Sequence, residues 1–279
     1  MAFATRFAPS PTGLLHKGHA FSALTGAKLA GEMGGQFILR IEDIDLGRCR
    51  PQFETAIYED LAWLGLDWQK PVRQQSDHFG DYQSALTRLR DRGLVYRCFK
   101  TRQEVLADIG RAPHGRPDAW RGQALAAGEE AARLAAGEVF AWRLSIESAL
   151  AVFPAAAELT YLEAGDGVEA GLRRVDLSST GDVVLARKDV GVAYHLAVVV
   201  DDALQGVTDV VRGADLVEAT PVQRLLQTLL GLPTPRYHHH RLIAGPDGKR
   251  FAKRDQSMTL RALREAGVTA SQVKAELGF

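Results

Sequence analysis

RFAPSPTGLLHKGH, residues 6–19, is the stretch of the chain that decides its fold. The apolar residues 3–8 predict a β-strand, the Pro- and Gly-rich residues 9–13 predict a tight turn, and the small residues 20–33 predict a helix. A strand, a short loop and a helix N-terminus in this order direct backbone N–H groups and the positive end of the helix dipole at one place. The stretch therefore predicts an anion-binding site.

Two histidines lie in this loop, His16 and His19, with Gly18 between them. Glycine has no side chain that could block a ligand, so the two imidazoles can contact an anion at the helix N-terminus. Histidines near a helix start can equally cap the helix or lie on the surface. The stretch by itself leaves both interpretations open.

The composition is that of a globular protein. The chain has 279 residues, enough for one large domain with an insertion or for two domains. Its 34 basic and 34 acidic residues give a formal net charge of +0, which excludes a general nucleic-acid coat but allows a local basic face. Two cysteines, Cys49 and Cys98, are too few for a disulfide framework. Because no apolar run reaches the ~20 residues of a membrane span, we expect a cytoplasmic protein.

The next segments predict a parallel sheet. Residues 36–41 (QFILRI) read as a buried strand that ends in the acidic residues Glu42, Asp43 and Asp45. Ligands bind at the carboxyl ends of parallel strands, so this cluster is well placed for a substrate amine, although a solvated acidic turn has the same sequence. Amphipathic helices at 51–64 and 77–92 and a strand at 94–99 continue a β-α-β order to about residue 98.

Two composition changes divide the rest of the chain. Residues 99–175 are rich in Ala, Gly, Pro and Arg with weak periodicity, which predicts an insertion. The core resumes with a strand at 182–185, an apolar run at 194–202 that ends in two aspartates, and a β-branched stretch at 207–212. A helix is expected from about residue 213 to residue 230.

A cationic loop comes last. Residues 248–254 (GKRFAKR) carry a cluster of positive charge on a Gly-Pro-rich turn, which is suited to binding an anion but is also typical of a solvated loop. Residues 259–279 predict a helical segment that packs on the core. The run His238-His239-His240 suggests a metal cluster, but adjacent side chains point in different directions, so we expect a structural role or a tRNA contact.

These segments resemble the class I aminoacyl-tRNA synthetases of the glutamyl type. HKGH after APSPTG resembles the HIGH motif, RIEDID and YHLAVVVDDALQGVTDVVRGADL match the substrate region, and RFAKR resembles the KMSKS loop. That loop departs from the family because Arg250 replaces the first Lys and Ala252 replaces the Ser. The firm parts of the resemblance cover residues 6–67, 181–220 and 249–260.

The resemblance implies a role for particular residues. It assigns catalysis to His16, His19 and Lys253, and ATP binding to Pro9, His16, Gly18, His19, Arg250 and Lys253. It implies that Glu42 binds the α-amino group of a bound glutamate. The other residues that it places in the glutamate site are Arg6, Ser10, Tyr194 and Arg212. The assignment is physically sound because a planar guanidinium can bind a carboxylate with two hydrogen bonds.

The resemblance also implies an α/β fold. It is a doubly wound, Rossmann-like parallel sheet with an inserted smaller α+β domain and a helical C-terminal segment. We expect residues 1–98 and 176–240 to form the two halves of the catalytic domain, 99–175 to form an acceptor-end-like insertion, and 241–279 to carry the KMSKS-like loop and the C-terminal helices. Relatives often bind zinc in the insertion through C-x-C and two further ligands. Here Lys100 stands two residues after Cys98, and one Cys with His114 cannot complete a tetrahedral site, so we predict no zinc.

The implied substrates are L-glutamate, ATP with Mg²⁺ and a tRNA. Full-length glutamyl enzymes have a large C-terminal region that binds the anticodon, whereas this chain ends soon after the cationic loop. The short branch of the family transfers glutamate to queuosine in tRNA(Asp), and we expect that reaction, with a monomeric protein and no membrane partner. Three alternatives stay open: a truncated enzyme that charges tRNA(Glu), a nucleotidyltransferase with an HxGH motif, and a non-catalytic RNA-binding paralogue.

Overall fold

The computed structural model describes residues 2–111, 120–187, 191–243 and 259–279. Its strands are β1 (Ala4–Phe7), β2 (Gln36–Ile41), β3 (Gln69–Gln74), β4 (Val95–Cys98), β5 (Ala141–Leu144), β6 (Thr160–Glu163), β7 (Gly171–Arg174), β8 (Val183–Arg187), β9 (Asp209–Gly213) and β10 (Arg236–His240). Its α-helices are α1 (Lys17–Glu32), α2 (Pro51–Trp63), α3 (Phe79–Asp91), α4 (Arg102–Arg111), α5 (Ala127–Ala135), α6 (Ile146–Val152), α7 (Tyr194–Leu204), α8 (Thr220–Leu230), α9 (Leu260–Glu265) and α10 (Ala270–Leu277). Short 3₁₀ helices are η1 (Gln75–His78), η3 (Pro154–Glu158) and η4 (Ala214–Ala219).

The main sheet has seven strands in the order β3-β2-β1-β9-β10-β6-β7. Every neighbouring pair from β3 to β6 is parallel, and only β7 runs antiparallel to its neighbour. Parallel strands present their carboxyl ends at one edge of a sheet. The ends of β1, β2, β9 and β10 therefore meet, although residues 7 and 240 are far apart in the chain. The predicted α/β fold with a mostly parallel sheet is confirmed.

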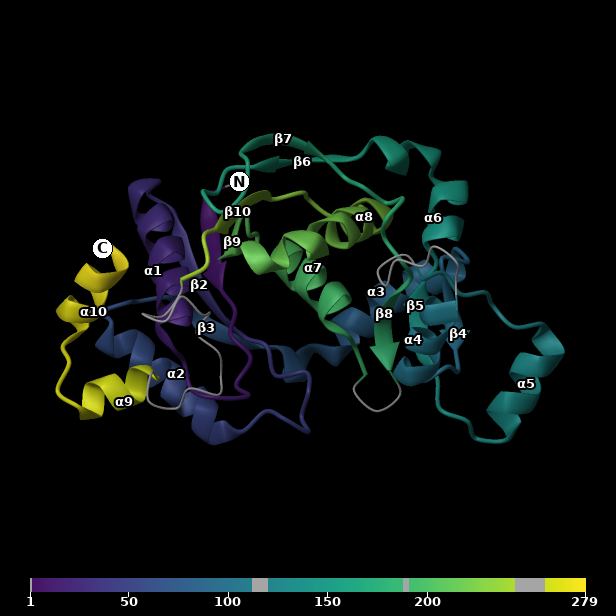
Figure 1. The fold of residues 1–279 in the computed structure, drawn as a ribbon, viewed down its shortest axis with the longest axis horizontal. Helices are drawn as coiled ribbons and strands as arrows, with labels where there is room; N and C mark the ends of the chain where they lie inside the picture. Colours follow the sequence, from purple (N-terminus) through teal and green to yellow (C-terminus); the bar gives the residue numbers. More distant parts are fainter. Residues whose placement is uncertain (1, 112–119, 188–190, 244–258) are drawn as a thin grey trace.

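Helices cover both faces of this sheet (Figure 1). On one face α1 packs against β1 and β2, and its cluster of buried apolar residues includes Leu24, Leu39 and Leu61. On the other face α7 lies between α3 and α8, with Leu196 and Leu226 in a second buried cluster. Gly26 lets α1 approach the sheet closely, since a Cβ there would lie 3.3 Å from the ring of Phe37.

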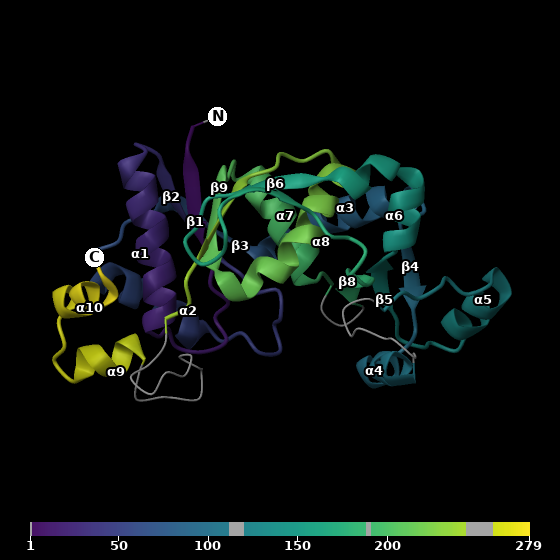
Figure 2. The ribbon, with the colours of Figure 1, turned by 45° about the horizontal axis from the view of Figure 1, so that its top comes forward.

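The strand predicted at 94–99 forms, but it does not continue the parallel sheet as we expected. β4 pairs with β5, and β5 with β8, in a separate antiparallel sheet of three strands. This small sheet lies at the end of the molecule away from α1, together with α4, α5 and α6 (Figure 2). Periodicity predicts that a strand forms but not its partner, which here lies more than forty residues along the chain.

The strands of the expected insertion at 99–175 do not form a sheet of their own. β6 pairs with β10 of the main sheet, with Tyr237 opposite Glu163. Conversely β8, which we placed in the second half of the catalytic domain, belongs to the small sheet. The boundaries predicted at residues 98 and 175 therefore do not coincide with the division between the two sheets.

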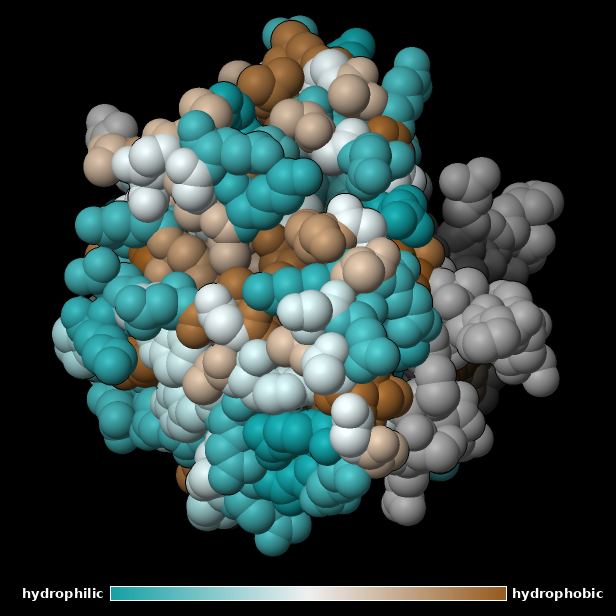
Figure 3. Space-filling view, turned by 90° about the vertical axis from the view of Figure 1, so that its left-hand side faces the viewer, coloured by the Kyte–Doolittle hydropathy of each residue, from teal (hydrophilic) through white to brown (hydrophobic). Residues whose placement is uncertain are grey.

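The C-terminal helices pack on the core beside α1 and α2, as predicted. Leu260, Val273 and Leu277 belong to the same buried cluster as the apolar face of α1. Seen from this end, the surface shows small hydrophobic groups separated by hydrophilic side chains (Figure 3). Within the described ranges no helix combines the length and apolarity that crossing a bilayer requires.

Asp60 on α2 is a buried carboxylate that faces α9. It is fully inaccessible, neither of its oxygens accepts a hydrogen bond from the described residues, and Nη2 of Arg264 stays 3.7 Å from its Oδ1. Burial raises the pKa of Asp60 to about 6, although Arg264 and Arg261 act in the opposite direction. The folded state therefore favours the protonated form, and the stability present at acid pH is lost as the pH rises through 6.

We expect Asp60→Asn to stabilise the protein above pH 6 by on the order of 2 kcal/mol, because the amide carries no charge to desolvate. Near pH 4 the wild type and the variant should unfold at nearly the same urea concentration. Urea unfolding at pH 8 and pH 4 measures both values, with the exposed Glu32→Gln as control. A wild type that is more stable than Asp60→Asn at pH 8 would contradict the burial argument.

Candidate active site

The carboxyl edge of the main sheet surrounds a cavity of about 520 Å³. A volume of this size accommodates a small substrate or a nucleotide. Residues from β1, α1, β2, α7, β9 and β10 line it, and they include Arg6, Pro9, Ser10, His16, Gly18, His19, Glu42, Tyr194 and Arg212. All the predicted site residues that the structure describes therefore border one cavity. Arg250, Lys253 and His114 lie outside the described residues.

The two histidines form the N-terminal end of α1. His16 is the N-cap, and its Nδ1 accepts a hydrogen bond of 3.1 Å from the backbone N–H of Gly18. Nδ1 of His19 accepts one of 3.2 Å from the N–H of His16, and the two rings stack with centroids 3.8 Å apart. The helix thus begins at Lys17, earlier than the predicted residue 20, because an imidazole nitrogen caps it as a Ser or Asp oxygen would. Capping and exposure to the cavity occur together, so the two interpretations are compatible.

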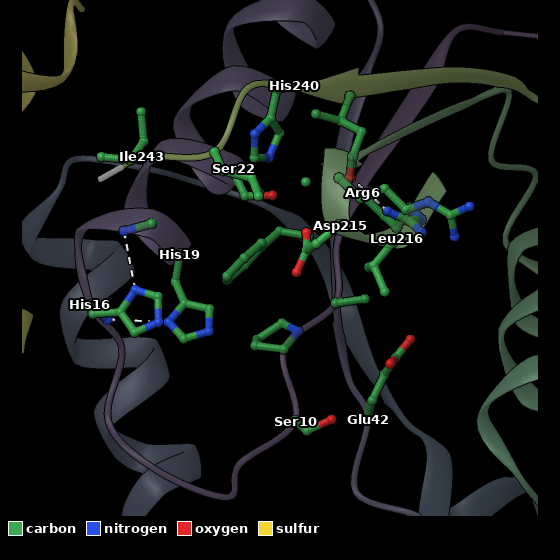
Figure 4. A pocket seen from close by; sticks show the side chains of 18 of the residues that line it. Arg6, Ser10, His16, His19, Ser22, Glu42, Asp215, Leu216, His240 and Ile243 are labelled. Carbon is green, nitrogen blue, oxygen red and sulfur yellow. Dashed lines mark hydrogen bonds between the residues drawn. The ribbon is translucent and has the colours of Figure 1, made fainter. Parts of the chain in front are cut away.

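Gly18 suits this packing. A Cβ at residue 18 would lie 3.0 Å from Cε1 and 3.1 Å from Nδ1 of His16, so the imidazole would have to shift by a few tenths of an ångström to make room for it. Figure 4 shows His16 and His19 on one side of the cavity and Arg6 and Glu42 on the other.

Both flanks of the cationic loop reach this histidine side. Ile243, the last described residue before the loop, lines the cavity. Thr259, the first one after it, forms a β-bridge with His16, and the N–H of Leu260 donates to the carbonyl of Leu15 over 2.8 Å. The described residues on either side of the loop, Ile243 and Thr259, therefore lie at this cavity and at His16.

Glu42 and Arg6 belong to a buried network of charges that the sequence did not reveal. Arg40, which is completely buried in β2, donates to Glu42 over 3.0 Å and to Asp202 over 2.8 Å. Nε of Arg6 lies 3.2 Å from the same Asp202 carboxylate, and its Nη1 donates to the carbonyl of Val211. The charged Arg40 inside the apolar segment FILRI was the available sequence signal.

The network shifts the pKa values of its two carboxylates, Glu42 and Asp202, in opposite directions. Burial raises the pKa of Glu42, and the nearby Arg40 and Arg6 offset this only in part. Asp202 is also desolvated, but two guanidinium groups contact it, so its pKa is lowered. Glu42 is therefore the acid that a cationic ligand group would stabilise most, and it faces the cavity.

Arg212 at the end of β9 is buried and makes no ion pair with any described residue. Its Nε donates to His239 over 3.0 Å, its Nη1 to Gln223 over 2.7 Å and its Nη2 to Thr220 over 2.8 Å. All three acceptors are neutral groups, and Arg212 borders the cavity with 4% of its surface exposed. A buried cation without an acid partner is costly unless an anion binds to it. The site is therefore positive at Arg212 and acidic at Glu42.

Tyr194 and Ser10 lie between the main cavity and a smaller one of about 210 Å³. Tyr194 is half-buried at the first position of α7, the apolar run at 194–202 whose element type the sequence left open. Ser10 is exposed in the loop after β1. Both cavities are lined by Ser10, Glu42 and Tyr194, so the smaller one lies next to the acidic end of the site.

The histidine run forms no metal site among the described residues. His238 pairs with Asp209 over 2.7 Å, and His239 lies between Glu163 and Arg212, so neighbouring side chains hold both imidazoles within the fold. At the place where relatives bind zinc, Cys98 is a buried free thiol at the end of β4, and Lys100 pairs with Asp108 over 2.6 Å. The absence of zinc stays a prediction.

Comparison with known proteins agrees with this geometry. The family described as "tRNA synthetases class I (E and Q), catalytic domain" matches residues 2–273. The chain belongs to this family. It is 43% identical to the Glutamyl-Q tRNA(Asp) synthetase of Rhodobacter capsulatus, over 99% of both chains. It is 40% identical to Glutamate--tRNA ligase 1 of Ruegeria pomeroyi, over 95% of this chain and 57% of that one.

A solved structure shows the same relationship. A glutamate tRNA ligase from Elizabethkingia meningosepticum, solved in complex with its amino acid, superposes with a TM-score of 0.75 at 27% identity. The match covers 91% of this chain, which spans about half (52%) of that ligase chain. The class I synthetase fold predicted from the sequence is thereby confirmed.

The buried network yields a stability prediction. Arg40→Met keeps the length of the side chain but leaves Glu42 and Asp202 without their main counter-charge, so we expect a loss of roughly 3–5 kcal/mol in the free energy of unfolding. Arg133→Met, which removes exposed pairs with Glu129 and Glu138, should change the free energy of unfolding far less. Urea unfolding at pH 7.5 compares the two variants. Equal losses would show that the network at Arg40 does not hold the sheet edge together.

Proposed function

We propose that the protein activates L-glutamate with ATP and transfers it to the queuosine base of tRNA(Asp). The observation that carries the proposal is that one cavity is lined both by Arg212, a buried cation without an ion-pair partner among the described residues, and by the carboxylate of Glu42. The helix N-terminus at HKGH borders the same cavity. An amino acid with an acidic side chain matches that charge pattern. We expect a monomer that acts in the cytoplasm.

Glutamate fits the cavity in one orientation. Its side-chain carboxylate accepts hydrogen bonds from Arg212, and its ammonium group neutralises Glu42, whose raised pKa reflects desolvation without a sufficient counter-charge. Arg6 is already bound to Asp202 and to a backbone carbonyl, so its main contribution is positive charge beside the substrate. The α-carboxylate is then left facing the histidine side of the cavity.

The first step joins this carboxylate to ATP. A carboxylate with a pKa near ~4 is ionised at neutral pH and needs no general base. One of its oxygens attacks the α-phosphorus in line, the bond to the bridging oxygen breaks, and pyrophosphate leaves with the electron pair. The products are glutamyl adenylate and pyrophosphate. Catalysis is then a matter of positioning and of stabilising phosphate charge.

The phosphate-binding groups are expected on the other wall. The N-terminal end of α1, with His16 and His19, supplies a positive dipole end to the triphosphate. The predicted contacts of Arg250 and Lys253 are supported by the position of both loop flanks, at Ile243 and Thr259. Mg²⁺ enters as part of the nucleotide complex and neutralises phosphate charge.

In the second step a hydroxyl group of the acceptor attacks the glutamyl carbonyl, and AMP leaves. The smaller cavity that shares Ser10, Glu42 and Tyr194 with the main one is where we expect the acceptor to approach, away from the histidines. Queuosine of tRNA(Asp) is the favoured acceptor because the relative named for that reaction matches this chain over 99% of both proteins. The ligase from Ruegeria pomeroyi, at 40% identity, makes tRNA(Glu) the second candidate acceptor. A nucleotidyltransferase would leave the uncompensated charge of Arg212 without a role.

Glutamate activation can be tested without any tRNA. We expect L-glutamate to drive exchange of pyrophosphate into ATP, and Arg212→Ala to lower kcat/KM for glutamate at least ~100-fold, since a charged hydrogen-bonded pair is lost. Arg236→Ala, whose guanidinium lies outside the cavity and pairs with Asp209, serves as control. Absence of exchange in the wild type would refute the activation step.

Acceptor choice needs a second measurement. Labelled glutamate should become attached to tRNA(Asp) that contains queuosine and not to the same tRNA with guanine at that position, because only queuosine carries the extra hydroxyl groups. The label should resist removal of the 3′-terminal adenosine. Charging of tRNA(Glu) at its 3′ end would instead support the truncated synthetase.

A further inference from the structure

Three side chains from three strands form a continuous buried chain of hydrogen bonds behind Arg212. Oε2 of Glu163 on β6 lies 2.5 Å from Nδ1 of His239 on β10, and Nε2 of His239 lies 3.0 Å from Nε of Arg212 on β9. Glu163 and His239 are both essentially inaccessible to water. Neither was among the residues that the sequence assigned to the site.

The chain allows only one tautomer of His239. Arginine can only donate hydrogen bonds, so Nε2 of His239 must present a lone pair to Arg212. The proton of the neutral imidazole is therefore on Nδ1, where it donates to the Glu163 carboxylate. A protonated His239 would direct an N–H group at the N–H of Arg212 and place two cations in contact.

Charged and titratable groups around His239 agree with this state. Burial and the charge of Arg212 lower the pKa of His239, while Glu163 acts in the opposite direction and His240 adds to the lowering. Burial alone would raise the pKa of Glu163, but hydrogen bonds from the side chain and N–H of His239 and from the N–H of Gly165 outweigh it, and the pKa is lowered. Glu163 is thus a carboxylate and His239 is neutral.

The same contacts fix how the guanidinium presents itself. Arg212 has five N–H donors, of which three donate to His239, Gln223 and Thr220. One donor on each terminal nitrogen remains for an anion, which matches the two oxygens of a carboxylate. Rotation of the guanidinium would lose this pair, and the acceptor on Nε is what opposes the rotation.

We propose that Glu163 and His239 are positioning residues that hold Arg212 in the orientation in which it binds the substrate carboxylate. The inference rests on the proposed function, because it takes the ligand of Arg212 to be glutamate. It also assigns a role to β6, the segment of the insertion that joins the main sheet. The turn after β6 has no space for larger side chains, since a Cβ at Gly165 would lie 2.3 Å from the carbonyl oxygen of His239.

Glu163→Gln keeps the shape of the side chain but removes the negative charge that fixes the tautomer of His239. If the amide NH₂ of the new side chain faces Nδ1 of His239, the imidazole proton must move to Nε2 and oppose Arg212. If the amide is turned over, its NH₂ faces the backbone N–H groups of His239 and Gly165, which now donate to Glu163. Either orientation sets two donors against each other, so the relay cannot stay intact.

Binding of L-glutamate, measured by isothermal titration calorimetry on the whole chain, tests the proposal independently of catalysis. We expect Glu163→Gln and His239→Phe to raise the Kd for glutamate at least ~10-fold, because Arg212 loses an oriented acceptor. His239→Gln should stay within roughly 3-fold of wild type, since its amide oxygen can accept from Arg212 while its NH₂ donates to Glu163. His238→Gln, one residue away and bound to Asp209, is the matched control and should leave the Kd unchanged.

Thermal melts confirm that each variant is folded, and if Glu163→Gln does not fold, the contrast between His239→Phe and His239→Gln decides. Glutamate binding by His239→Phe or a folded Glu163→Gln that equals wild type overturns the positioning role. So does equal weakening by His239→Phe and His239→Gln, which indicates packing alone. A wild type that binds glutamate but exchanges no pyrophosphate would refute the proposed reaction and leave the positioning role standing.

Discussion

Arg212 carries a positive charge on a side chain that is almost entirely buried at the wall of the cavity, and every group that accepts a hydrogen bond from it in the described structure is neutral. Arg6 and Arg40 at the same sheet edge are different, because Asp202 compensates both of them. Of these three guanidinium groups, that of Arg212 is therefore the one that is left to bind an external anion. Desolvation makes that selection strong, since a buried charge gains more from a ligand than an exposed one does.

The strand order is what brings this charge to its partners. β9 lies between β1 and β10, and β1 lies beside β2, so the residues that end these strands meet although some of them, such as Phe7 and His240, are more than 200 positions apart in the chain. The loop after β1 ties the edge together, because the carbonyl of Pro9 accepts a hydrogen bond of 3.0 Å from the N–H of Glu42. The site is thus a consequence of parallel pairing, which the loop after β1 reinforces.

Local patterns were sufficient for most elements. β2 has the predicted bounds because FILRI is apolar except for Arg40 and glycines precede it, and α2 differs from the prediction by only one residue because Pro51 marks its first turn. The start of α1 was missed because imidazole caps are not distinguishable from ligand-binding histidines in a sequence. Pairing partners were missed for a related reason: nothing local in β4 or β6 tells which sheet it will join. Motif resemblance found Glu42 and Arg212, whereas Arg40, Glu163 and His239 matter through contacts that only the folded chain creates.

The cavity is thus an amino-acid site with opposite charges at its two ends and a phosphate site on its histidine side. A crystal structure with L-glutamate and a non-hydrolysable ATP analogue tests this most directly. The account predicts the glutamate side-chain carboxylate within hydrogen-bond distance of both terminal nitrogens of Arg212, with the ammonium group at Glu42. A glutamate bound with its side chain elsewhere, and Arg212 contacting protein atoms alone, would contradict it.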